Sequence, residues 1–217
     1  MPPDRQDTVD PRGGGAGLGP GRTVGGRYRL DSVLGRGGMG VVWAGHDQLL
    51  HRPVAVKEVV PPSAIDDADR VALRARTLRE ARAAARISAD GVVAIYDVVE
   101  DDGRPWIVME RLPPRTLEDE IAERGGLPPD EVARIGLTLL AGLRAAHAAG
   151  VLHRDVKPAN VMFRERPDGR RAVLADFGIA HFDGDAMLTA TGMMMGSPAY
   201  LAPERARGER ATPASDL

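Results

Sequence analysis

Residues 28–110 carry the pattern that most limits the fold, because short β-rich runs alternate there with turn residues and are interrupted only once. The runs read YRLDSVLG, VVWAGHD, PVAVKEVV, VVAIYDVVE and PWIVME. The interruption, at about residues 64–87, lacks Gly and Pro and is rich in Ala, Arg and Leu, which favours a helix. Its apolar residues at helical spacing are Val71, Leu78, Ala81 and Ala85. We predict a five-stranded antiparallel sheet with one helix inserted after the third strand.

From residue 111 the chain becomes helical in character. TLEDEIAER predicts a short helix, and a longer helix is expected to begin at Pro129 and to stop at Gly150. The apolar stripe of the longer helix consists of Val132, Ile135, Leu139 and Leu143. Loops and short strands follow. The fold class is therefore α+β, with a β-rich lobe at 26–110 and a mainly helical lobe at 111–217.

Composition narrows the class of protein further. Residues 1–25 are dominated by Gly, Pro and charge, so we expect a disordered leader, because little apolar surface is available to offset the entropy of ordering it. A formal net charge of -2 disfavours nucleic acid as a partner. Neither a membrane span nor a signal-peptide core is visible in this chain, and we expect it in the cytoplasm. The absence of cysteine excludes disulfides and thiolate metal sites.

Two residue types are almost missing from the chain. Of its 29 basic residues only Lys57 and Lys157 are lysine, and Asn160 is the only asparagine. An ammonium is a compact point charge that the broad, planar guanidinium of arginine does not reproduce. We therefore expect the two lysines and the asparagine at positions where the chemistry of a site does not allow another residue type.

Gly35, Gly37 and Gly40 form a GxGxxG sequence between two β-rich runs. A dinucleotide-binding fingerprint needs a helix directly after the glycines, which argues against a dinucleotide-dependent oxidoreductase. A P-loop is excluded because no GK[ST] follows. Two interpretations remain, a flap over nucleotide phosphates and an ordinary hairpin turn.

The sequence VAVK places Ala55 and Lys57 on the same face of a strand, where the small Ala55 leaves room for a flat base. An exposed edge lysine is the alternative interpretation. Glu80, on the inserted helix, could neutralise Lys57, or it could be an ordinary i,i+4 partner of an arginine such as Arg76.

The strongest local signal is HRDVKPAN, residues 153–160. A short loop with this spacing can aim the Asp155 carboxylate at a hydroxyl and the Asn160 amide oxygen at Mg²⁺, while Lys157 reaches a transferring phosphate. Asp176, in the DFG sequence after the apolar run AVLA, supplies a second oxygen ligand of the kind that Mg²⁺ prefers.

With GRGGMGVV, VAVK, HRDVKPAN, DFG and APE in this order, residues 26–217 resemble the eukaryotic-type (Hanks-type) serine/threonine protein kinases, and in style the bacterial PknB-like kinases. The resemblance implies a bilobal fold whose C-terminal lobe is incomplete here. It implies transfer of the ATP γ-phosphoryl group to Ser and Thr hydroxyls of protein substrates, with Mg²⁺ or, as an alternative ion, Mn²⁺. A truncated, non-catalytic ATP-binding or interaction fragment is the alternative function, and a longer gene product could be anchored in a membrane.

The resemblance also assigns roles to residues. Catalytic roles fall to the base Asp155 and to Lys157, Lys57 and Glu80, and metal binding falls to Asn160 and Asp176. The residues implied in nucleotide binding are Gly35, Gly37, Gly40, Val42, Ala55, Lys57, the gatekeeper Met109, and the hinge residues Glu110 and Leu112.

The resemblance places an activation segment at residues 176–204, with the hydroxyls of Thr189 and Thr191 in its middle. We expect autophosphorylation there, with a homodimer as the arrangement for transfer in trans and Arg154 as the docking group for the phosphate. A merely polar loop is the alternative. Asp216 is expected to anchor the catalytic loop from below.

Overall fold

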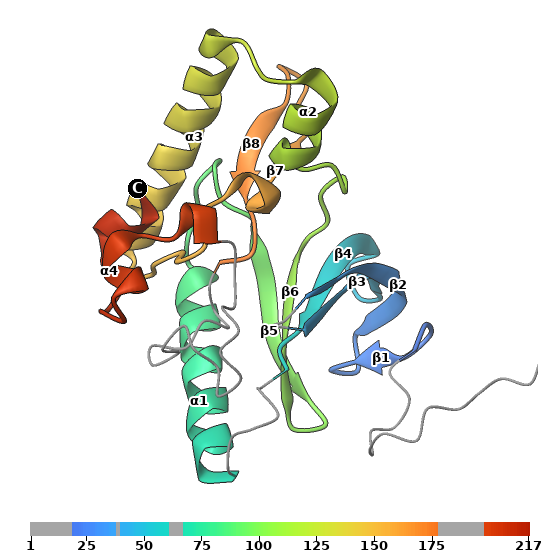
Figure 1. Cartoon of the computed structure of the whole chain (residues 1–217). Coiled ribbons are helices and arrows are strands. Elements are labelled where there is room, and N and C mark those ends of the chain that lie inside the picture. Colours follow the sequence, from blue (N-terminus) through green and yellow to red (C-terminus); the bar gives the residue numbers. More distant parts are fainter. Residues whose placement is uncertain (1–18, 38–39, 61–66, 178–197) are drawn as a thin grey trace, which may run out of the picture.

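The computed structural model describes residues 19–37, 40–60, 67–177 and 198–217 and has two lobes that meet where β6 ends (Figure 1). The first lobe is built on an antiparallel sheet of order β1-β2-β3-β4-β6-β5. Its strands are β1 (Thr23–Val24), β2 (Tyr28–Gly37), β3 (Gly40–Asp47), β4 (Arg52–Glu58), β5 (Ile95–Asp101) and β6 (Arg104–Glu110). One helix, α1 (Asp67–Ala84), lies between β4 and β5 in the sequence and alongside the sheet in space (Figure 1).

The sheet has six strands rather than the predicted five, because part of the expected disordered leader joins it. β1 pairs with the beginning of β2, and Val24 is fully buried. Arg22 donates a hydrogen bond to Asp101 Oδ2 at 3.1 Å. The buried Val24 and the paired Arg22 offset the entropy of ordering this short stretch. The glycines on both sides of it make the strand hard to detect in the sequence. Residues 1–18 of the predicted leader lie outside the described residues.

The alternation predicted for β4 is confirmed. Val54 and Val56 are fully buried in a cluster that contains both tryptophans of the chain. Ala55 belongs to a second cluster, which extends from the sheet to the other lobe. Lys57 is buried as well, with 8% of its surface exposed, so it is not an exposed edge lysine. The strand thus separates a packed core from the face that carries the candidate site.

The inserted helix is confirmed as α1, but its buried face differs from the prediction. Thr77, Ala81 and Ala84 are buried, whereas Val71 is 67% exposed and Ala85 is also exposed. Among the side chains described on α1, the buried ones lie in its second half, whereas those described before Thr77 are exposed or half-buried. The small residues on the buried face allow a close approach to the sheet.

The second lobe contains the predicted short and long helices. They are α2 (Leu117–Arg124) and α3 (Pro129–Ala148), followed by the hairpin β7 (Val161–Arg164) and β8 (Arg171–Leu174) and by α4 (Pro203–Ala206). Single 3₁₀ turns occur at Pro158–Asn160, Pro198–Tyr200 and Pro213–Asp216. The α3 stripe buries Leu143 against the hairpin, but Val132, at the start of the helix, is 52% exposed, contrary to expectation. None of the described helices is long and apolar enough to cross a membrane.

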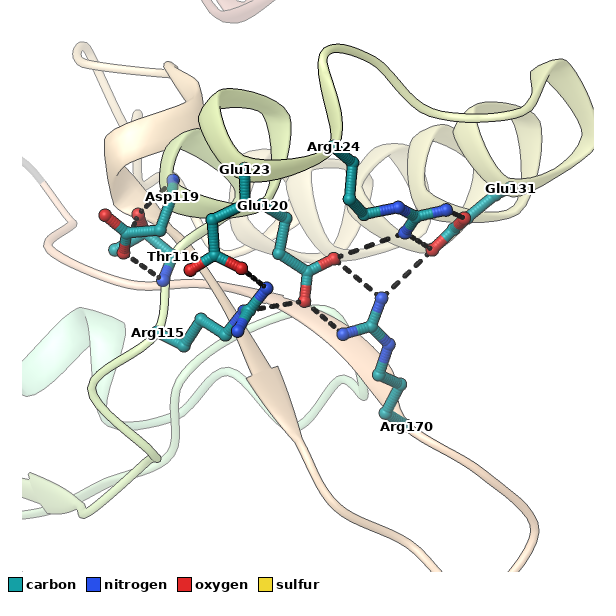
Figure 2. Close-up of polar contacts among 8 residues, drawn as sticks. All are labelled: Arg115, Thr116, Asp119, Glu120, Glu123, Arg124, Glu131 and Arg170. Carbon is teal, nitrogen blue, oxygen red and sulfur yellow. Dashed lines mark hydrogen bonds and ion pairs between the residues drawn. The ribbon is translucent and has the colours of Figure 1, made fainter.

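Glu120 is a buried carboxylate that connects α2 to the β7–β8 turn and, through Arg170, to α3 (Figure 2). It accepts two hydrogen bonds from the guanidinium of Arg170, one of them at 2.7 Å. Arg170 also contacts Glu131 of α3 at 3.0 Å, and Arg124 bonds to the same carboxylate at 2.8 Å. The hydrogen bond from Arg170 lowers the pKa of Glu120, and burial opposes this only in part. The position of α2 therefore depends on an ionised Glu120.

We expect Glu120→Gln to lower the free energy of unfolding by about 2 kcal/mol at pH 7, because hydrogen bonds to a charged group are lost. The pKa of Glu120 is lower in the folded state, so its contribution is present above the ordinary value of 4.5 and is lost as the pH falls through the folded-state pKa. Denaturant unfolding of both proteins from pH 7 to about pH 3 should show the difference shrinking.

Glu123→Gln on the same helix is the matched control, since this carboxylate is 60% exposed in its pair with Arg115. It should change stability by less than about 0.5 kcal/mol. A destabilisation by Glu120→Gln that stays constant across the pH range would contradict the ionic explanation.

Candidate active site

Gly35 and Gly37 lie in the last residues of β2, Gly40 is the first residue of β3, and Gly37 pairs with Gly40. Gly40 has a φ of +131°, and a Cβ there would lie 2.0 Å from the carbonyl oxygen of Glu58, so a larger residue would clash. Gly35 and Gly37 have open space at the Cβ position. Because Gly40 is the first residue of β3, the last glycine opens a strand and not the helix that a dinucleotide-binding fingerprint needs.

Lys57 contacts the second lobe directly. Its Nζ lies 2.8 Å from Oδ1 of Asp176, the residue that follows the β8 strand by two positions. The predicted pocket residues Ala55 and Met109 share one buried cluster, and Val42 and Leu112 pack against it. The structure therefore brings the residues expected to surround a nucleotide to the junction of the lobes.

Glu80 has other partners than the one expected. Its carboxylate accepts a hydrogen bond from Arg76 Nε at 2.9 Å and lies 3.6 Å from a terminal nitrogen of Arg154. Among the ion pairs of the described residues, Lys57 is joined to Asp176 and not to Glu80. The i,i+4 alternative is thus the one observed in this structure, because α1 is placed so that Glu80 faces arginines. A role of Glu80 toward Lys57 stays a prediction.

The catalytic-loop candidates lie within hydrogen-bonding distance of one another. Lys157 Nζ is 2.8 Å from Oδ2 of Asp155, and the amide nitrogen of Asn160 donates to the same oxygen at 2.9 Å. The amide nitrogen also donates to the backbone carbonyl of Asp155 at 2.7 Å. The nitrogen of the Asn160 amide is therefore engaged, and its oxygen is the atom suited to a cation. The backbone N–H of Ala175 bonds to the Asn160 carbonyl at 2.8 Å, which sets Asp176 beside this loop.

His153 supports the loop from the protein interior. It is fully buried, and burial lowers its pKa, so the imidazole is neutral. Its Nδ1 accepts from the Asp155 backbone N–H at 3.3 Å, which leaves Nε2–H to donate to the Ala175 carbonyl at 2.8 Å. The ring also meets Phe177 edge to face, with 4.8 Å between centroids. One imidazole thereby joins the backbone of Asp155 to that of Ala175, the residue before Asp176.

Asp216 holds the same loop from the other side, as predicted. Its carboxylate accepts hydrogen bonds from the backbone N–H groups of His153 at 2.9 Å and Arg154 at 2.7 Å. His147 Nε2, from the end of α3, lies 2.7 Å from the same carboxylate. Arg154 has a φ of +66°, a backbone conformation that is costly for a residue other than glycine. The carboxylate therefore helps to hold a strained turn directly before Asp155.

Comparison with known proteins agrees with this geometry. The family model described as "Protein kinase domain" matches residues 28–217. The chain belongs to the protein kinase domain family. This membership confirms the resemblance seen in the motifs and the bilobal α+β fold expected from it.

The individual relatives and solved structures that match this chain are also kinases by name. The serine/threonine-protein kinase PknL of Mycobacterium tuberculosis is 39% identical over 191 residues, covering 88% of this chain and 46% of PknL. The probable serine/threonine-protein kinase SCO3848 of Streptomyces coelicolor is 41% identical, covering 90% of this chain and 29% of the relative. The crystal structure of the Mycobacterium tuberculosis PknI kinase domain has a TM-score of 0.71 and 32% identity, covering 92% of this chain and 73% of that one. The kinase domain described here thus spans less than half the length of these curated relatives.

Two of the predicted functional positions of the kinase domain, Thr189 and Thr191, lie outside the described residues. Sequence reasoning also left two supporting residues without a role, His147 and His153. The available signal was that two of the five histidines in the chain stand six positions apart, His147 near the end of the predicted long helix and His153 as the first residue of the HRDVKPAN loop. Their buried contacts become visible only when α3 and the 3₁₀ turn that contains Asp216 are placed together.

Proposed function

We propose that this chain is the catalytic region of a protein kinase that transfers the ATP γ-phosphoryl group to Ser and Thr hydroxyls of proteins. The observation that carries the proposal is the convergence at the lobe junction of Lys57 with Asp176 and of Lys157 with Asp155. The names of the relatives support Ser and Thr as acceptors. Because ATP is the donor, we place the reaction in the cytoplasm.

Nucleotide binding is assigned to the first lobe and the hinge. The Gly35–Gly40 turn would cover the phosphates, and Lys57 would hold the α and β phosphates. Ala55 leaves space for the adenine ring, with Val42 beside it and Met109 at the end of the pocket. Backbone groups of Glu110 and Leu112 would bind adenine. The N–H of Glu110 already donates to the Ala94 carbonyl at 2.9 Å, so we assign adenine to the Glu110 carbonyl.

The donor atoms fit a hard divalent cation. The Asp176 carboxylate and the Asn160 amide oxygen are oxygen ligands, which Mg²⁺ prefers, and Mn²⁺ accepts the same set. Among the described residues no group of three or more His, Cys, Asp or Glu side chains could hold a metal ion. We therefore propose that Asn160 and Asp176 hold Mg²⁺ together with phosphate oxygens of the nucleotide. The ion, when bound, supplies neutralisation of phosphate charge.

The two oxygens of Asp155 differ in a way that assigns the base. Oδ2 accepts from both Lys157 and Asn160, whereas the described residues offer no partner to Oδ1. We assign Oδ1 as the atom that receives the proton of the substrate hydroxyl. As the hydroxyl oxygen bonds to the γ-phosphorus, the bond from that phosphorus to the β–γ bridging oxygen breaks and ADP leaves. Lys157 stabilises the transferring phosphoryl group.

The observed partners of Glu80 support a phosphorylation switch. Arg154 contacts the Glu80 carboxylate at 3.6 Å. A phosphate on Thr189 or Thr191 carries more charge than a carboxylate and would compete for this guanidinium. Glu80 would then become available to Lys57. Transfer between two copies of the kinase in a homodimer is the arrangement we propose for this reaction.

Calorimetry of the full-length protein tests the nucleotide site. We expect ATP to bind at least about 10-fold more tightly with Mg²⁺ than without it, because the ion joins phosphate oxygens to Asn160 and Asp176. A double variant with Asn160→Asp and Asp176→Asn serves as a comparison. It exchanges the amide and the carboxylate between the two ligand positions and keeps the total charge. Equal ATP affinity with and without Mg²⁺ would refute the metal assignment.

Phosphosite mapping tests the switch. After incubation of the full-length protein with Mg²⁺ and ATP, we expect phosphate on Thr189 or Thr191, and a slower activation in the Thr189→Ala/Thr191→Ala double variant. The double variant should keep its ATP affinity, because neither threonine is assigned to nucleotide binding. Phosphate found only outside residues 176–204 would contradict the switch.

A further inference from the structure

The guanidinium of Arg164, the last residue of β7, makes contacts with two separate segments. Its Nε donates to Oε2 of Glu110 at 2.9 Å, and a terminal nitrogen donates to Oε1 of the same carboxylate. The terminal nitrogens also donate to the backbone carbonyls of Asp90 at 2.9 Å and Val92 at 3.0 Å. The side chain is 16% exposed, and the hydrogen bonds to Glu110 raise the pKa of the Arg164 guanidinium, which is therefore charged and largely shielded from solvent. A fork of this kind fixes orientation as well as distance.

Glu110 is held through both its side chain and its backbone. Its Oε1 also accepts the backbone N–H of Ala94 at 2.8 Å, and its own N–H donates to the Ala94 carbonyl at 2.9 Å. Both the side chain and the backbone of this hinge residue are therefore tied to residues 90–94. Arg164 closes the arrangement by bonding to Glu110 and to that segment at once.

Residues 90–94 are in turn fixed to the second lobe. The carbonyl of Gly91 accepts the N–H of Leu174 at 2.9 Å, and Val93 donates to the Leu174 carbonyl at 3.0 Å. A Cβ at Gly91 would lie 2.2 Å from the carbonyl oxygen of Thr138 in α3, so the backbones meet in close contact. Residues 90–94, which support Glu110, are thus fixed to β8, the strand that leads to Asp176.

From this arrangement we propose that Arg164 is a positioning residue for the nucleotide site, which holds the backbone of Glu110 where it meets the adenine ring. The inference rests on the proposed function, since it takes the hinge as the adenine site. Arg164 itself does not touch the nucleotide. It acts by limiting the movement of Glu110. A shift of about 1 Å in a group that binds the ligand is enough to misplace the ligand strongly.

The full-length protein with Arg164→Gln tests the proposal. We expect the Kd for Mg²⁺-ATP and the Kd for adenosine to rise about 10-fold, which corresponds to about 1.4 kcal/mol. The KM for ATP should rise with them, while kcat stays within about 3-fold because Asp155 and Asn160 are untouched. Arg164→Lys should recover part of the affinity, since one ammonium bonds to the carboxylate but does not span both carbonyls as well. Glu110→Gln should cost a similar amount, and the double variant no more than either single one.

Two comparisons separate positioning from general damage. Arg166→Gln lies on the same hairpin and removes an exposed pair with Asp90 at 2.8 Å, but not a contact with Glu110, so ATP affinity should not change. Mg²⁺-tripolyphosphate, which lacks adenine, should bind the Arg164→Gln and natural proteins equally. Equal loss of tripolyphosphate and ATP binding, or ATP binding by Arg164→Gln within twofold of the natural protein, would overturn the proposal. Failure of the natural protein to bind ATP would instead overturn the proposed function.

Discussion

Lys57→Arg and Lys157→Arg should each lower the single-turnover rate of phosphoryl transfer at least about 100-fold in the full-length protein, without unfolding it. Both ammonium groups lie 2.8 Å from a carboxylate, Lys57 from Asp176 and Lys157 from Asp155. The longer, planar guanidinium cannot take a compact position between a carboxylate and phosphate oxygens. One misplaced donor in a preorganised site costs about 2.7–4 kcal/mol of transition-state stabilisation. Charge alone therefore does not preserve the rate.

Arg134→Lys is the matched control for both lysine variants. Arg134 lies on α3 and pairs with Asp130 at 2.8 Å, with both side chains about 70% exposed. This exchange should change stability by less than about 0.5 kcal/mol and leave the transfer rate unchanged. Thermal melts would show that all three variants fold. Near-normal single-turnover rates in both lysine variants would mean that the two retained lysines are an accident of composition.

Asp216→Ala should be the most destabilising single substitution at the base of the catalytic loop, with a loss of about 3–5 kcal/mol. It leaves the backbone N–H groups of His153 and Arg154 without their shared acceptor and removes the partner of His147. Asp216→Asn keeps one acceptor oxygen, so we expect it to fold. Its amide nitrogen opposes one backbone N–H, and kcat should fall about 10-fold or more as the strained turn at Arg154 relaxes.

Chemical denaturation and steady-state kinetics of the full-length protein measure these two effects. Asp130→Asn, an exposed carboxylate on α3, is the control and should leave both quantities nearly unchanged. The anchoring role is incorrect if Asp216→Asn folds and keeps full kcat. The KM for ATP should change little in Asp216→Asn, because the partners of Asp216 are His147, His153 and Arg154 and none of them is assigned to nucleotide binding.

Much of the site could be predicted because its chemistry is concentrated in short segments. Asp155, Lys157 and Asn160 lie within six consecutive residues, and their mutual contacts follow from one loop. The pocket face of β4 followed from strand alternation alone. Residue chemistry contributed as well. The chain has only two lysines, and they mark the positions where arginine cannot replace lysine.

The errors arose where a position depends on a distant neighbour. β1 has only two residues, and its burial against β2 leaves no periodic pattern to detect. Val71 has a suitable spacing on α1, but it is exposed, and the buried side chains described on this helix lie farther along. Glu80 had two plausible types of partner, and the placement of α1 selected the arginines.

The sequence by itself determined the order of the strands and helices other than β1, the face of β4 that carries Lys57, and the identity of the loop residues, because each depends on spacing within a few residues. Only the tertiary structure decided which charges that are distant in the sequence pair with one another. With 27 arginines and 31 acidic residues, most carboxylates have many chemically equivalent partners, and sequence distance does not distinguish among them. Glu110 meets Arg164 and Glu120 meets Arg170 across 54 and 50 positions. These pairs form because packing of the hairpin, the hinge and α2 brings the groups together in places shielded from solvent, where a guanidinium fork stabilises a carboxylate.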